Sequence, residues 1–225
     1  MALAAVLFGT AAIAQVPPLS IPLVGLVSQL PFSAWNPATS GSQYVFTNNN
    51  LTASATWPAN GGAIARVTTS KSSGKWYFEV THTTVATQGG ADVGIANASA
   101  AIANELGSDN NSYGYYSGNP SGGVAGLYHG GSTPVVSTTG YGSGAIISIA
   151  LDMDHLKIYW AVNGVWQASG NPAAGTGGYA ITAGSWFAAA DGGAWPNGSE
   201  SSAFTLNVGK TAFSYAIPTG FAAWH

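Results

Sequence analysis

The stretch ISIALDMDHLKIYWAVNGVW, residues 147–166, carries the strongest local signal in this chain. Apolar residues alternate with small or polar ones over residues 147–152 and again over residues 158–162, which is the period of half-buried strands. A polar break at residues 152–155 separates the two runs. Asn163-Gly164 follows the second run, and this dipeptide favours a hairpin because a type I′ turn needs positive φ at both central residues. The stretch therefore predicts three antiparallel strands joined by two tight turns.

Strand-like runs recur along the rest of the chain, with turn signals between them. They lie at residues 44–46, 51–57, 63–69, 75–84, 92–96, 185–190, 203–208 and 212–215. In the run 75–84, Trp76, Phe78 and Val80 fall on one face, and Tyr77 and Glu79 fall on the other. Many short strands at fairly even spacing indicate a sandwich or a barrel. No convincing helical period and no internal repeat interrupts this pattern.

The composition narrows the class of protein. Of the 225 residues, 46% are hydrophobic, so a core can be filled, whereas only 6% are charged, against roughly 25% in an average soluble protein. Five Lys and Arg residues and a net charge of −3 exclude the basic face that nucleic-acid binding requires. The absence of cysteine excludes disulfides and thiolate metal sites. The composition favours an extracellular, adhesive or particle-bound protein.

The first charged side chain is Arg66. Residues 1–14, MALAAVLFGTAAIA, form an apolar run that is too short to span a bilayer, and residues 12–14 resemble a signal-peptide cleavage site without the usual basic residues before it. Three interpretations stay open: a hydrophobic anchor that docks to a partner, a weak signal peptide, or an extra element of the domain. We expect residues 1–32 to be an irregular hydrophobic attachment segment or signal peptide, and residues 33–225 to be the folded domain.

The reactive side chains are sparse and dispersed. The eight acids form no E-x-D-x-E pattern, and the four histidines show no H-x-x-x-H spacing. Glu79 and Asp152 lie in strand motifs, where a structural role is expected. Asp152 and Asp154 resemble a calcium-binding D-x-D, but Asp at a turn ordinarily caps backbone amides. We therefore predict no catalytic residue, no metal site and no cofactor. Three or more carboxylates or imidazoles converging in a deep pocket would contradict this.

The remaining signal is aromatic. Tyrosine, tryptophan and histidine occur among Gly, Asn and Ser in two regions, 107–131 and 191–197. Rigid aromatic rings flanked by small polar residues are typical of surfaces that bind proteins or sugars. The candidate ligand-binding residues are Tyr116, Tyr128, His129, Asp191, Trp195 and Asn197.

Several segments, in order and spacing, resemble the SPRY domain across residues 35–224. They are residues 74–80 (GKWYFEV), 93–96 (VGIA), 106–107 (LG), 112–115 (SYGY), 149–154 (IALDMD), 158–164 (IYWAVNG), 206–209 (LNVG) and 212–213 (AF). The resemblance implies a two-sheet antiparallel β-sandwich of the concanavalin-like jelly-roll kind. It also implies a binding module rather than an enzyme, with a partner held by variable loops at one end. The matching residues belong to core and turns, so none is assigned a role in binding.

Residues 170–178 and 217–221 are similar to SPRY domains of phage and bacterial proteins, which are often attached to virions or tails. We therefore expect a non-enzymatic component of a virion or other surface assembly. Residues 1–32 would attach it to a protein partner, and its loops would contact a cell-surface protein or glycan. It would be located on a virion, outside the cell or at the cell surface, and it would neither span a membrane nor bind nucleic acid. The alternatives are a secreted bacterial lectin-like protein and, less favoured, a concanavalin-like glycan hydrolase.

Overall fold

The computed structural model describes residues 32–57, 62–86, 90–119, 122–192 and 200–225. These residues form one short 3₁₀ helix, Pro37–Thr39, and otherwise only strands and loops. The strands are β1 (Val45–Thr47), β2 (Thr52–Trp57), β3 (Ile64–Lys71), β4 (Lys75–Thr84), β5 (Asp92–Ala96), β6 (Ser112–Tyr116), β7 (Gly126–Tyr128), β8 (Val136–Ser137), β9 (Ile146–Asp152), β10 (Lys157–Val162), β11 (Val165–Trp166), β12 (Tyr179–Ala180), β13 (Trp186–Asp191), β14 (Glu200–Asn207) and β15 (Ala222–Ala223). The predicted attachment segment lies outside the described residues, except for Phe32.

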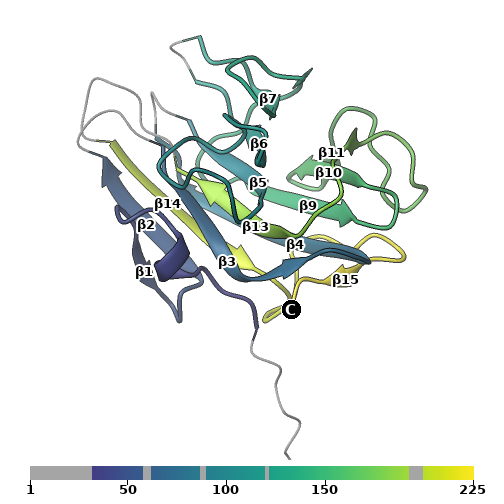
Figure 1. The fold of residues 1–225 in the computed structure, drawn as a ribbon, viewed down its shortest axis with the longest axis horizontal. Helices are drawn as coiled ribbons and strands as arrows, with labels where there is room; N and C mark the ends of the chain where they lie inside the picture. The colour runs from purple at the N-terminus through teal and green to yellow at the C-terminus, as the bar shows by residue number, and fades with distance from the viewer. Residues whose placement is uncertain (1–31, 58–61, 87–89, 120–121, 193–199) are drawn as a thin grey trace, which may run out of the picture.

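The strands make two sheets that pack face to face (Figure 1). The first sheet runs in the order β1-β2-β14-β4-β9-β10-β11, with β12 paired to β10 and β15 paired to β4. The second sheet runs β3-β13-β5-β6-β7-β8. All pairs are antiparallel except the short pair of β15 with β4. The prediction of an all-β, two-sheet antiparallel sandwich is confirmed.

The local predictions for residues 147–166 are confirmed. β9, β10 and β11 are consecutive antiparallel neighbours, and Val162 pairs with Val165 across a two-residue turn. Asn163 and Gly164 have φ values of 47° and 80°, as a type I′ turn requires. The Asn163 side chain also accepts a hydrogen bond from the Ile146 amide at 2.9 Å, which ties the turn to the start of β9.

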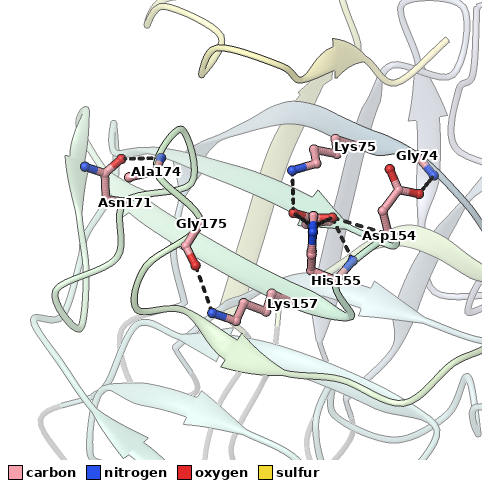
Figure 2. A network of polar contacts seen from close by, with 9 residues as sticks. Gly74, Lys75, Asp154, His155, Lys157, Asn171, Ala174 and Gly175 are labelled. Atoms are coloured by element: carbon pink, nitrogen blue, oxygen red, sulfur yellow. Dashed lines mark hydrogen bonds and ion pairs between the residues drawn. The ribbon is translucent and has the colours of Figure 1, made fainter.

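Asp152 closes the other turn, between β9 and β10. Its Oδ1 accepts hydrogen bonds from the amides of Asp154 and His155 at 3.1 and 3.0 Å, so it has the capping role expected of Asp at a turn. Lys75 Nζ and His155 Nδ1 each lie 2.9 Å from Asp152 Oδ2 (Figure 2). Burial opposes ionisation of Asp152, but the hydrogen bonds from Lys75 and His155 outweigh it and lower the pKa of this carboxyl. Asp154 accepts from the Gly74 amide instead (Figure 2).

The main core fills the space between the sheets and is unusually aromatic. Trp35, Phe78, Phe204 and Trp224 are fully buried in it, and the rings of Trp35 and Phe204 meet edge to face with centroids 5.4 Å apart. Trp35 also donates its indole N–H to the Leu51 carbonyl at 3.1 Å, so its one polar atom is satisfied inside the core. Burial of such rings removes apolar surface from water and stabilises the fold.

The outer face of the first sheet is covered by the C-terminal segment, and here one sequence prediction is wrong. Residues 212–215 do not form a strand. The amides of Ser214 and Tyr215 donate to the carboxylate of Glu79, each at 2.9 Å, while Phe213 packs edge to face on Tyr77. Because a buried side-chain carboxylate takes the place of a neighbouring strand, the segment follows the sheet without pairing to it. Glu79 therefore has the structural role expected of it.

His82 is the one histidine in the described core, and it generates a prediction about pH. The ring is fully buried beside Tyr141 and Phe204, and neither of its nitrogens has a hydrogen-bond partner among the described residues. Burial lowers the pKa of His82 from 6.5 to about 3. Below pH 6.5 His82 is protonated in the unfolded chain but stays neutral in the folded chain. The free energy of unfolding therefore falls as the pH falls towards 3.

The variant His82→Phe should lack this contribution. We expect the free energy of unfolding of the native protein, relative to that of the variant, to fall between pH 6.5 and about 3 with a slope of up to about 1.4 kcal/mol per pH unit. Denaturant titrations of both proteins across this range measure the difference and cancel the contributions of the carboxyl groups. Parallel curves for the two proteins would show that His82 is protonated without penalty in the folded state.

Candidate functional site

The described residues enclose a pocket of about 440 Å³ on the outer face of the second sheet. Strands β5, β6 and β7 form its floor, and its walls come from the segment between β5 and β6 and from the loops on both sides of β7. In Figure 1 these strands lie on the opposite side of the view from the C-terminus. The pocket is lined by Asp92, Glu105, Leu106, Ser108, Tyr116, Asn119, Gly122, Gly123, Tyr128, Gly131 and Ser132.

Strand alternation determines which side chains reach the floor. In β5, Val93 and Ile95 enter the main core, so Asp92 projects to the outer face. The register places Asp92 opposite both Tyr116 on β6 and Asp191 on β13. On β5, Val93 and Ile95 thus point into the core, while Asp92 and its cross-strand neighbour Asp191 point outward.

A glycine lets the pocket wall approach the floor. A Cβ atom on Gly114 would lie 2.4 Å from the Leu106 carbonyl oxygen and 2.9 Å from Asp92 Oδ1, so only glycine permits this contact. Leu106 itself is buried with Ile64 and Ala189 in a small apolar cluster on the outer face. The segment that carries Glu105 is therefore packed on the sheet.

Hydrogen bonds fix that segment in place. Asp191 Oδ2 accepts from the Leu106 amide at 3.2 Å, and its Oδ1 accepts from the Ala63 amide at 3.3 Å. The Ser112 hydroxyl accepts from the Gly107 amide at 2.8 Å and donates to Asp109 Oδ1 at 3.0 Å. The wall is thus held by bonds from β13 and β6, so the position of Glu105 is set before any ligand arrives.

The two tyrosines of the pocket are held in the same way. Tyr116 and Tyr128 meet edge to face, with ring centroids 5.6 Å apart at 83°. The Tyr128 hydroxyl donates to the Val124 carbonyl at 2.7 Å, and Asn119 donates its amide to the Tyr116 hydroxyl. Asn119 also accepts from the Gly123 amide at 2.9 Å. The aromatic wall is therefore rigid and partly exposed, as in surfaces that bind ligands with little loss of side-chain entropy.

Asp92 is the most perturbed group of the pocket. It is 3% exposed, and its Oδ1 has no hydrogen-bond partner among the described residues. Burial, then the charges of Asp191 and Glu105, hold the pKa of Asp92 well above its ordinary value. Burial also raises the pKa of Glu105. Strongly shifted carboxyl groups at a pocket are a recognised sign of a functional site.

The structure brings together only part of the predicted set of ligand-binding residues. Tyr116 and Tyr128 line the pocket. Asp191 lies fully buried under its wall and supports it. His129 bonds the Ser112 carbonyl and stacks on Tyr113, with centroids 3.9 Å apart, and does not line the pocket. Trp195 and Asn197 lie outside the described residues. For all six, binding of a ligand stays a prediction.

Sequence reasoning missed Asp92, Glu105 and Asn119. The outward direction of Asp92 could have been predicted from the sequence. Alternate residues of a strand point to opposite faces, so Asp92 faces away from the core that Val93 and Ile95 enter. Glu105 lies in a segment without a regular period, so only the fold shows that it approaches Asp92.

The pocket contains two carboxyl groups, and this bears on the prediction of no catalysis. Asp191, the third acid nearby, is engaged by two backbone amides beneath the wall. A glycosidase needs one carboxyl kept protonated and a second kept ionised. Here burial raises the pKa of both lining acids, so the two shifts have the same direction rather than opposite ones. No cluster of three or more metal-ligating side chains occurs among the described residues.

Comparison with known proteins places the fold. Residues 75–173 match the family model of the SPRY domain. The SPRY domain of human HERC1 superposes with a TM-score of 0.60 at 15% identity, covering 80% of this chain and 100% of that one. A second human SPRY domain gives a TM-score of 0.56 at 16% identity, with 77% and 99% covered. No curated protein matches the chain.

Residues 75–173 thus match the SPRY domain family, and the described residues have the fold of a SPRY sandwich. SPRY domains are typically protein-binding modules and generally not catalytic. The finer similarity to domains of phage and bacterial proteins stays a prediction. In the part of the chain that the structure describes, no helix has the length and apolar composition needed to cross a bilayer.

The variant Asp92→Asn should be more stable than the native protein near neutral pH. The folded-state pKa of Asp92 lies above the ordinary 3.8, so this group stabilises the fold fully below pH 3.8 and loses that contribution as the pH rises through its folded-state pKa. The advantage of the variant in thermal midpoint should therefore grow from acidic to neutral buffer, by roughly 2–4 °C for each kcal/mol gained.

Asp152→Asn is the matched control, and it should change stability in the opposite direction. The pKa of Asp152 is lowered, so its contribution is present above pH 3.8 and is lost as the pH falls through the folded-state pKa. Thermal unfolding followed by circular dichroism compares both variants with the native protein. A loss of stability at neutral pH in both would mean that Asp92 is an ionised, satisfied carboxylate.

Proposed function

We propose that this chain is a non-enzymatic binding module that holds a segment of a protein partner in the pocket formed by β5, β6, β7 and the 97–111 segment. The observation that carries this proposal is the rigid pair of Tyr116 and Tyr128 beside the unpartnered Oδ1 of Asp92. Pockets with a few fixed polar groups among aromatic rings are the usual form of binding sites.

The architecture of the pocket supports binding rather than turnover. Its walls are fixed by hydrogen bonds to Asp191 and Ser112, so little ordering is required when a partner docks. Its volume of about 440 Å³ suits one or two side chains of a partner rather than a long polymer. A lectin-like site would use the same aromatic rings. The test must therefore distinguish a protein ligand from a sugar ligand.

The variant Gly131→Trp should block the pocket without disturbing the fold. Gly131 lines the pocket, and a Cβ atom there would meet no atom within 4 Å. Gly142→Trp is the matched control, because Gly142 is equally open but does not line the pocket. We expect peptides selected from a displayed random library against the native protein to bind the control equally and to bind the blocked variant about tenfold or more weakly.

Equal binding by all three proteins would contradict the proposed pocket. A glycan array probed with the same three proteins tests the alternative. If no peptide is selected, and glycan binding is lost in Gly131→Trp alone, the ligand of the pocket is a sugar rather than a protein. Turnover of a polysaccharide that is abolished by Asp92→Asn would overturn the non-enzymatic assignment.

We also propose that residues 1–32 attach the domain to a virion or another surface assembly, which would place it outside the cell or at the cell surface. The low content of charge and the absence of any charged residue before Arg66 support this. Mass analysis of the mature N-terminus tests it. We expect a chain that retains residues 1–14, whereas a start at Gln15 would favour the secreted, lectin-like alternative.

A further inference from the structure

Two acidic side chains, Asp92 and Glu105, line the pocket, and no Lys, Arg or His is among the described lining residues. Burial of a carboxyl group without a cation is unfavourable, and it is relieved either by protonation or by an external positive charge.

The basic residues of the chain do not supply that charge. Arg66 donates to the carbonyls of Thr39 and Asn97. Lys75 pairs with Asp152. Lys71 and Lys157 donate to carbonyls of His225 and Gly175, and Lys210 does not line the pocket. Among the described residues, no lysine or arginine pairs with Asp92.

The aromatic walls suit a cation as well. The faces of tyrosine rings carry partial negative charge and attract ammonium and guanidinium groups. Tyr116 and Tyr128 present their rings beside Asp92, and their hydroxyls are already fixed by Asn119 and the Val124 carbonyl. Asp92 on the floor is 3% exposed, and its Oδ1 is buried without a hydrogen-bond partner among the described residues.

We propose that this pocket binds a basic side chain, arginine or lysine, that the protein partner presents. The inference rests on the proposed function and adds the chemistry of the partner: a positive group that pairs with Asp92 and Glu105 while its alkyl stem packs on Tyr116 and Tyr128. The volume of about 440 Å³ accommodates one such side chain.

The test uses the whole chain and a small probe. Nα-acetylarginine amide and the Nα-acetyllysine amide are titrated into ¹⁵N-labelled protein, with the backbone amides of Leu106, Gly122 and Gly123 as reporters. Nα-acetylcitrulline amide is the neutral control of nearly the same shape. We expect saturable shifts at these amides with at least one cationic probe, and binding of citrulline that is about tenfold or more weaker.

Two acid-to-amide variants localise the effect. Asp92→Asn should weaken binding of the cationic probe about tenfold, and Glu105→Gln should weaken it in the same direction. Asp154→Asn makes the same change in net charge at an exposed turn and should leave binding unchanged. The dispersion of the amide spectrum shows that each variant is folded.

Equal affinity for arginine and citrulline amides, equal effects of Asp92→Asn and Asp154→Asn, or no binding of either cation would overturn the inference. These failures are distinct from failure of the proposed function. One further result separates the two: selected peptides bind the native protein but not Gly131→Trp, and still bind after every Lys and Arg is replaced by Gln. That result would support the proposed pocket and contradict the basic side chain.

Discussion

The antiparallel pairing of β13 with β5 places Asp191 directly opposite Asp92 on the outer face of the second sheet. Two carboxyl groups are thereby buried side by side, and they differ in their hydrogen bonding. Asp191 accepts two backbone amides and holds the pocket wall, whereas Asp92 keeps one oxygen without a partner among the described residues. The support of the pocket wall and the unpartnered oxygen of Asp92 both follow from this single register.

Much of the fold could be predicted because its signals are local. The alternation in residues 147–166 and the Asn163-Gly164 turn depend only on neighbours along the chain, and they gave the correct strands. The prediction for residues 212–215 failed because the partner of that segment is the carboxylate of Glu79 rather than a strand. An apolar pattern cannot distinguish a strand from a segment that a side chain holds against a sheet.

Less of the site could be predicted from the sequence, because its residues lie far apart along the chain. Tyr116 and Tyr128 could be proposed from composition alone, since aromatic residues among glycines are typical of binding loops. The meeting of Asp92, Glu105 and Asp191 depends on strand register and on the path of the 97–111 segment. The SPRY scaffold supplies that register, but scaffold alone does not assign a ligand. The chemistry of the pocket has to be derived from its own side chains.

The scarcity of ion pairs has a consequence for the environments that this domain can tolerate. Among the described residues, Lys75 with Asp152 is the single pairing of a Lys or Arg with a side-chain carboxylate. Dissolved salt weakens attraction between exposed charges, so a fold with few exposed ion pairs loses little stability at high salt concentration. Strongly hydrated anions such as sulfate strengthen apolar burial further. The architecture is thus compatible with fresh water and with concentrated saline alike.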